Sequence, residues 1–273
     1  MIAQAALALV LGVPVLLTGT PATQARLHAT LTAQPTRQPL TLDLNAVESD
    51  RSRPITRYDW DMTKKLHMIV ISDDLRDFMH VHPVLGSDGH FRLRLHFPKP
   101  ALYHIYIDGI AHNLGRQIYR FDLDVASHAK ALSARRVPLP GHVSTAGPYR
   151  VTIDKTQLIA GEQTLITVKL LRGGKPASDL RPYLGAMGHG VFIGVDDLSY
   201  VHVHAMDAMM MQMMGTDDCG DAIMTMNPIA ADAKVPATLQ FYLKAPVAGT
   251  YRLWFQFGAP ARDYAAAFTV VAR

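Results

Sequence analysis

The chain has 273 residues, a formal net charge of +4 and 49% hydrophobic residues. This composition excludes a disordered chain, and the absence of any run of Lys and Arg argues against nucleic-acid binding. The length is sufficient for two domains of ordinary size. Cys219 is the only cysteine, so no internal disulfide can stabilise the fold, and its thiol is unused, joined to another molecule, or a metal ligand.

The first predicted element in chain order is an export signal. Residues 3–17 are almost wholly apolar, and Thr23-Gln24-Ala25 supplies a site with small residues at its two outer positions. The apolar run is shorter than the roughly 18 residues that a membrane-spanning helix requires. We therefore predict a signal peptide over residues 1–25, cleaved after Ala25, and a periplasmic or secreted protein. No Lys or Arg precedes the run, which leaves an uncleaved anchor, and with it membrane attachment, as the alternative.

Two later segments align without gaps around their histidines. In each, one histidine is followed by a His-x-His pair at offsets of 13 and 15, giving the trios His67, His80, His82 and His189, His202, His204. Downstream, Phe91–Pro98 aligns with Leu239–Pro246, and Tyr103–Ile107 aligns with Tyr251–Phe255. Because chance agreement over several separated blocks is improbable, the sequence indicates one module present twice.

Short β-rich runs separated by turn residues make up each copy. Gly173-Gly174, between two such runs, is typical of a hairpin turn because glycine readily adopts a positive φ. No long stretch has the 3.6-residue period of a helix, which disfavours a parallel α/β fold. We therefore predict an all-β chain of two tandem immunoglobulin-like antiparallel β-sandwich domains.

The domain boundaries follow from the alignment of the two copies. We predict the first sandwich over residues 40–126, a linker over 127–147 and the second sandwich over 148–273. The second copy carries 26 more residues than the first after its His-x-His pair. This Met-rich insertion, over residues 205–238, is predicted to be a loop or a short helix.

The histidines are the first candidate ligands. Successive side chains on a strand point to opposite faces, so the two histidines of each His-x-His pair share one face. A third, His67 or His189, could complete each set from a paired strand. Neutral imidazole is the commonest protein ligand for zinc and copper. The alternative is a structural role, in which half-buried histidines form hydrogen bonds across strands.

Soft donors in the insertion are the second candidate group. Thioether and thiolate sulfurs favour Cu(I) over zinc or magnesium. The candidate residues are Met206, Met209, Met210, Met213, Met214 and Cys219. The alternative is a short helix whose methionines fill a gap or contact a partner. No histidine follows Cys219, so a blue-copper electron-transfer centre is disfavoured.

Three strings carry a resemblance to a known group. The segments His67–Pro83, Tyr183–His189 and the run from Ala160 to Gly185 resemble a poorly characterised bacterial group with tandem immunoglobulin-like modules. These proteins are secreted or membrane-tethered and are associated with heavy-metal and copper handling. The resemblance implies the fold and the exported location, but no activity. The chain departs from the pattern at Ala205, which replaces the proline found after the first His-x-His pair, and in the Met-rich insertion.

These observations predict a periplasmic or envelope protein that binds copper, as Cu(I) or Cu(II), with zinc as the alternative ion. The second domain would hold the principal site and the first a weaker site made of histidines alone. An envelope protein that exchanges the metal would be its partner. The sequence has no Gly-rich phosphate loop, Gly-x-Ser-x-Gly elbow or His-Glu-x-x-His helix, so we expect no enzyme. The second hypothesis is a non-catalytic interaction module whose Met-rich loop contacts a partner.

Overall fold

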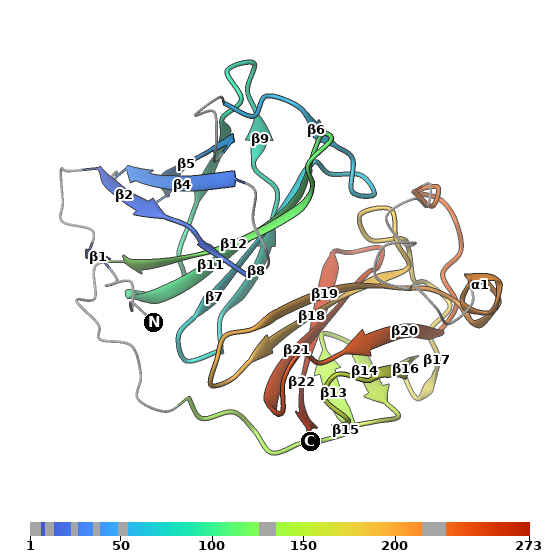
Figure 1. Ribbon diagram of the computed structural model, residues 1–273. Coiled ribbons are helices and arrows are strands. Elements are labelled where there is room, and N and C mark those ends of the chain that lie inside the picture. Colours follow the sequence, from blue (N-terminus) through green and yellow to red (C-terminus); the bar gives the residue numbers. More distant parts are fainter. Residues whose placement is uncertain are drawn as a thin grey trace. The chain divides into compact units, whose positions relative to one another are not determined.

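The computed structural model describes residues 7–8, 14–22, 27–34, 39–48, 54–125, 135–214 and 228–273 (Figure 1). The chain divides into two compact units, Met1–Arg135 and Arg136–Arg273. Among the described residues, no helix has the length and apolar character needed to cross a membrane.

The first unit is a sandwich of two sheets. One sheet has the order β1-β12-β11-β7-β8, with β3 paired to β12 and β6 paired to β11. Its strands are β1 (Leu7–Ala8), β3 (Thr20–Pro21), β6 (Tyr58–Asp59), β7 (Leu66–Ser72), β8 (Phe78–Val81), β11 (Ala101–Ala111) and β12 (Gly115–Val125). The other sheet has the order β2-β4-β5-β10-β9. Its strands are β2 (Val15–Thr18), β4 (Leu27–Gln34), β5 (Leu40–Glu48), β9 (Val84–Leu85) and β10 (Phe91–Leu95).

The second unit repeats this plan. The order β15-β22-β21-β18-β19 matches β1-β12-β11-β7-β8, including a parallel pair at the same edge. These strands are β15 (Gln157–Leu158), β18 (Gly188–Gly194), β19 (Tyr200–Ala205), β21 (Gly249–Gly258) and β22 (Asp263–Ala272). The other sheet contains β13 (Val143–Ala146), β14 (Tyr149–Ile153), β16 (Gln163–Arg172), β17 (Lys175–Pro176) and β20 (Thr238–Lys244). A short helix, α1 (Ala208–Met214), follows β19. The predicted tandem β-sandwich is confirmed.

Each unit has its own hydrophobic core between its two sheets. Along β5 buried residues alternate with partly exposed ones, from Leu40 to Ala46, because one face of the strand packs inward. β7 is buried along its whole length: Met68 and Val70 belong to the first core cluster, and the residues between them lie on the other face. One face of β7 therefore packs against the core, and the opposite face carries His67.

A tyrosine corner stabilises the same bend in both units. Tyr103 Oη donates a hydrogen bond to Lys99 O at 3.0 Å, and Tyr251 Oη donates one to Val247 O at 2.7 Å. The contact resembles a recurring feature of immunoglobulin-like sandwiches, in which a tyrosine hydroxyl binds the backbone a few residues upstream. The repeated contact shows that the sequence alignment of the two copies is also a structural one.

The unit boundaries differ from the predicted ranges at two places. β2, β3 and β4 lie before residue 40 and pair within the first unit, and Val15 and Leu17 are buried in its core. β13 falls inside the predicted linker and pairs with β14. In β4 the inward positions alternate between leucine and alanine and the outward ones are polar, so two of the four inward side chains are small and the apolar signal is weak. β2 and β3 lie within the predicted signal peptide, so its cleavage would remove both strands from the first unit. The predicted cleavage site, Thr23-Gln24-Ala25, lies outside the described residues, so cleavage stays a prediction.

Candidate metal centres

The histidines of the first unit lie on the face of the sheet that is turned away from the core. Met68 and Val70 of β7 point into the core, so His67 points to the opposite side. β8 pairs antiparallel with β7, and the residues beside its histidines pack against the core. His80 and His82 therefore share the face of His67, as the alternation of side chains predicted.

Three ring nitrogens converge there. His67 Nδ1 lies 2.9 Å from His80 Nε2 and 3.3 Å from His82 Nε2. The centroids of the three rings are 4.8 to 5.1 Å apart. Four ligands held tetrahedrally at about 2.0–2.1 Å from an ion are about 3.3–3.4 Å from one another. The three nitrogens thus need only small shifts to hold one ion.

Two of these imidazoles, His67 and His82, are held in the neutral form that binds metals. Burial lowers the pKa of His67, although Asp61 and Asp108 act in the opposite direction. Burial also lowers the pKa of His82 to about 3, with further contributions from His67 and Lys64. A neutral imidazole keeps a nitrogen lone pair available for coordination, so no proton has to be displaced from these rings at neutral pH.

Charged side chains surround the first trio. The second ring nitrogen of His67, Nε2, lies 3.7 Å from Asp61 Oδ2. Asp108 lies directly opposite His67 in the register of β7 and β11. Arg116 joins the two carboxylates: its Nη2 donates to Asp61 Oδ2 at 2.8 Å and its Nη1 donates to Asp108. A carboxylate behind the outer nitrogen of a histidine is the usual partner of a metal-binding imidazole, because it fixes the ring and raises its basicity.

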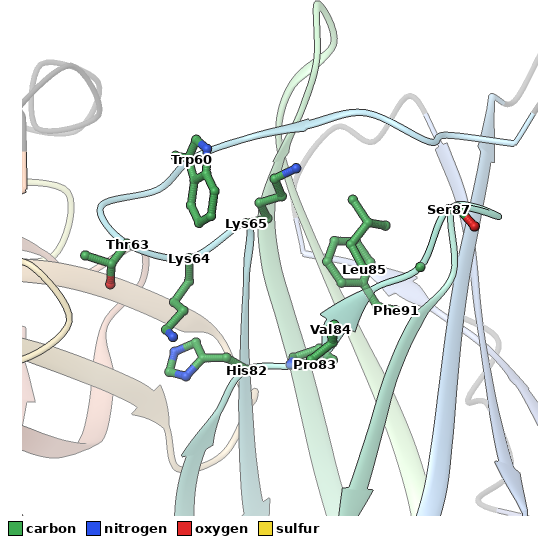
Figure 2. Close-up of a pocket in the computed structure, with 11 residues that line it drawn as sticks. Trp60, Thr63, Lys64, Lys65, His82, Pro83, Val84, Leu85, Ser87 and Phe91 are labelled. Atoms are coloured by element: carbon green, nitrogen blue, oxygen red, sulfur yellow. The ribbon is translucent and has the colours of Figure 1, made fainter.

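A cavity of about 500 Å³ reaches this trio at His82. Figure 2 shows Lys64 extending toward the His82 ring from one wall, with Trp60 and Thr63 above it and Leu85 opposite. Because His82 belongs both to the trio and to the cavity wall, the cavity brings solvent to one edge of the trio.

The second unit repeats the trio on equivalent strands. His189 of β18 lies directly opposite His204 of β19, and His202 is on the same face, because Val201 and Val203 pack against the second core. Nitrogens from the three rings all lie within 4.8 Å of one another. The ring centroids are 4.6 to 5.4 Å apart. Each unit therefore holds a buried histidine cluster that could hold a metal ion.

Uncharged groups surround the second trio. The Tyr183 ring meets the His189 ring edge-on, with centroids 5.2 Å apart. Gln256 lies opposite His189 in the register of β18 and β21, and its Nε2 donates to Tyr183 Oη at 3.2 Å. Burial raises the pKa of Tyr183 above its usual range, with Asp263 adding to the effect, so the phenol stays neutral. An amide and a phenol therefore orient the ring of His189.

The predicted sulfur ligands differ in their burial and in their contacts. Met206 is buried, with 3% of its surface exposed, yet it is not part of the second core cluster. Met209 is 64% exposed. Met210 packs against the second core cluster, as the alternative of a short helix with gap-filling methionines predicts. The side chains of Met213 and Met214, and all of Cys219, lie outside the described residues. Met187 and Met206 are buried sulfurs that each lie two residues from the second trio, and of the two only Met206 is outside the second core cluster.

Both units fall within one family match. The family model covers residues 20–127 and 143–273, one part in each unit. The chain belongs to the DUF8832 family. The model describes it as a domain of unknown function, so membership supports the two-part architecture and says nothing of copper. No curated protein matches the chain. The association with copper handling therefore still rests on the resemblance of the sequence strings.

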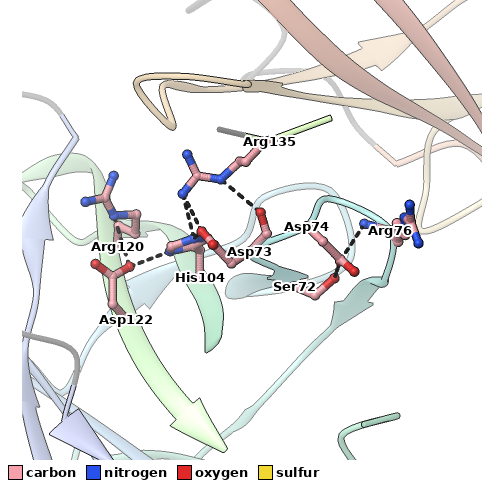
Figure 3. Close-up of polar contacts among 8 residues, drawn as sticks. All are labelled: Ser72, Asp73, Asp74, Arg76, His104, Arg120, Asp122 and Arg135. Carbon is pink, nitrogen blue, oxygen red and sulfur yellow. Dashed lines mark hydrogen bonds and ion pairs between the residues drawn. The ribbon is translucent and has the colours of Figure 1, made fainter. Parts of the chain in front are cut away.

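A buried ionic cluster in the first unit escaped the sequence reasoning. His104, 2% exposed, lies between two carboxylates, with Nε2 at 2.7 Å from Asp73 Oδ1 and Nδ1 at 2.7 Å from Asp122 Oδ1 (Figure 3). Arg135 Nε donates to Asp73 O at 2.9 Å, and Arg120 Nε lies 3.3 Å from Asp122 Oδ1. Because carboxylates engage both ring nitrogens, His104 is a structural histidine rather than a ligand.

One signal in the sequence could have pointed to this cluster. The strand registers place Arg252 where the first unit has His104, and Thr269 where it has Asp122. Aligned copies that differ at two such buried positions indicate a contact present in only one of them.

Proposed function

We propose that this protein is an exported metal-binding protein that holds one transition-metal ion at each histidine trio and sequesters or transfers copper, with zinc as the alternative ion. The observation that supports the proposal is the convergence of three ring nitrogens at equivalent places in both units. A single buried histidine is commonly structural, whereas three ring nitrogens that lie close together favour coordination, and both copies of the module keep the three histidines.

Three protein ligands suit an ion that is exchanged. Structural zinc sites close four positions with protein side chains, whereas three ligands leave one position for water or another molecule. A donor from a partner could occupy that position while the ion is passed on. The cavity beside His82 favours such access in the first unit. An envelope protein that exchanges copper is accordingly the partner that we propose.

The test is metal stoichiometry by competition titration of the purified protein with Zn²⁺ and with Cu(I). The wild-type chain should bind two ions. His80→Ala with His82→Ala should remove one equivalent, His202→Ala with His204→Ala should remove the other, and the four changes together should remove both. A matched control is His90→Ala with His112→Ala, since these partly exposed histidines bind Asp43 and Asp59 instead. Stoichiometry that is unchanged in the quadruple variant would overturn the proposal.

Removal of the Met-rich insertion tests its part in the second site. Deleting residues 206–226 should weaken Cu(I) binding by the second unit and leave binding by the first unit unchanged. The exposure of Met209 favours the other candidate function, an apolar contact with a protein partner. That candidate predicts a purified protein without metal and the loss of the partner on deletion. Elemental analysis of protein isolated from its native envelope separates the two functions.

A further inference from the structure

The two trios can be compared position by position. Asp61 and Tyr183 each precede the first histidine of a trio by six residues. Each forms an isolated antiparallel β-bridge with the residue three positions later, Asp61 with Lys64 and Tyr183 with Ala186. The residue after each has the same left-handed backbone, with φ of 54° and 53°. The two turns are thus equivalent, and they place a carboxylate near one trio and a phenol near the other.

The residue opposite the first histidine on the neighbouring strand also differs between the units, because it is charged in the first unit and uncharged in the second. Asp108 lies opposite His67 and Gln256 lies opposite His189. Arg116 binds both carboxylates in the first unit. The equivalent strand position in the second unit holds Asp263, which is exposed. The first trio is therefore set among buried ionised groups, whereas the groups that contact His189 are uncharged.

Surroundings of this kind discriminate between ions by their charge. A fixed carboxylate attracts a divalent ion twice as strongly as a monovalent ion at the same distance. The cost of removing an ion from water rises steeply with its charge, so uncharged surroundings penalise the divalent ion more. Asp61 and Asp108 are each 1% exposed, and Arg116 offsets one of their two negative charges, so one net negative charge stays beside the trio. Lys64 acts in the opposite direction, but it lines the open cavity, where water and salt screen it.

We infer that the two centres have different ions: His67, His80 and His82 take a divalent ion such as Zn²⁺ or Cu²⁺, and His189, His202 and His204 take a soft monovalent ion such as Cu⁺. The inference rests on the proposed function, because it requires that both trios bind metal. Met206, buried just beyond His204, adds a soft donor next to the second trio in the chain.

The experiment uses full-length chains that keep one trio each. His202→Ala with His204→Ala leaves the first centre, and His80→Ala with His82→Ala leaves the second. Each is titrated with Zn²⁺ and with Ag⁺, which replaces Cu⁺ without redox chemistry. The ratio of Zn²⁺ to Ag⁺ affinity should be at least about tenfold higher for the first centre, in line with the size of other effects from groups behind the ligands. Binding with equal ratios overturns the inference alone, whereas absence of binding in both chains overturns the proposed function.

Charge variants provide the second readout. In the chain that keeps the first centre, Asp108→Asn should weaken Zn²⁺ binding by about 10- to 100-fold and Ag⁺ binding by much less. Lys64→Gln should act oppositely and strengthen Zn²⁺ binding. Lys64 is partly exposed, so this variant keeps the test valid if Asp108→Asn fails to fold. Equal changes for both ions in the variants that fold would overturn the inference.

Discussion

Replacement of His104 by leucine measures how much the buried ionic cluster stabilises the first unit. The side chain is 2% exposed, and each of its ring nitrogens lies 2.7 Å from a carboxylate oxygen. A ring that donates from both nitrogens satisfies Asp73 and Asp122 together. Leucine has a similar volume and no donor, so the change removes two charge-assisted hydrogen bonds and leaves one buried acceptor, on Asp73, and one partly buried acceptor, on Asp122.

The magnitude follows from these contacts. A hydrogen bond to a charged group contributes about 1.5–3 kcal/mol, which gives an upper range of about 3–6 kcal/mol for the pair. Each carboxylate retains a guanidinium, because Arg135 binds Asp73 and Arg120 lies beside Asp122. We therefore expect the free energy of unfolding of the first unit to fall by about 3 kcal/mol. For a unit of this size the melting temperature should fall by about 10 °C.

Thermal and urea unfolding of the full chain, followed by calorimetry and circular dichroism, measure the loss. Arg252→Leu is the matched control, because Arg252 occupies the equivalent position and donates to Thr269 Oγ1 at 3.2 Å. A neutral acceptor contributes less, so this variant should lower the stability of the second unit by about 1 kcal/mol. If His104→Leu costs no more than Arg252→Leu, the reasoning about charge-assisted contacts is refuted.

Three further predictions concern the same two sandwiches. Tyr103→Phe and Tyr251→Phe should each lower the stability of their own unit by about 1–2 kcal/mol, because each removes the hydroxyl donor of a tyrosine corner; an unaltered urea midpoint would contradict this. Burial opposes ionisation of Asp122, but the hydrogen bond and charge of His104, together with the charge of Arg120, outweigh it and lower the pKa of Asp122. The stability that this carboxylate provides should therefore be complete above about pH 4 and should be lost as the pH falls further, a slope that Asp122→Asn should reduce in acid titrations. N-terminal sequencing of exported protein should find a chain that begins after Ala25, and an intact Met1 would favour the uncleaved anchor.

The sequence was sufficient to predict the trios because their geometry is local. Offsets of 13 and 15 place a histidine and a His-x-His pair on two neighbouring strands of one hairpin. The two-residue period of a strand then puts both histidines of the pair on one face, whatever the rest of the fold. The same local argument predicted the hairpin strands of both units, which the structure confirms.

The groups behind the histidines could not be predicted in this way. Asp108 lies opposite His67 only through the register of β7 and β11, which are neighbours in the sheet but are separated along the chain by the residues between Ser72 and Ala101. Asp61 reaches the site through a turn that depends on the left-handed backbone of Met62. Contacts of this kind depend on long-range pairing, and no periodic pattern marks them. The early strand β4 was missed for a different reason, since two of its four inward residues are alanine, whose small side chain gives a weak apolar signal.

Comparison of the units separates what maintains the fold from what sets the chemistry. Tyr103 and Tyr251, which close the same bend in each sandwich, are identical in both units. The positions that touch the first histidine of each trio differ in charge, with Asp108 in one unit and Gln256 in the other. The trios lie on the sheet face away from each core, so a change beside them does not disturb core packing. The charged positions beside the first trio are nevertheless buried and ion-paired, so Asp108→Asn is expected to cost stability, whereas changes at the partly exposed His80 and His82 are expected to leave the sandwich folded.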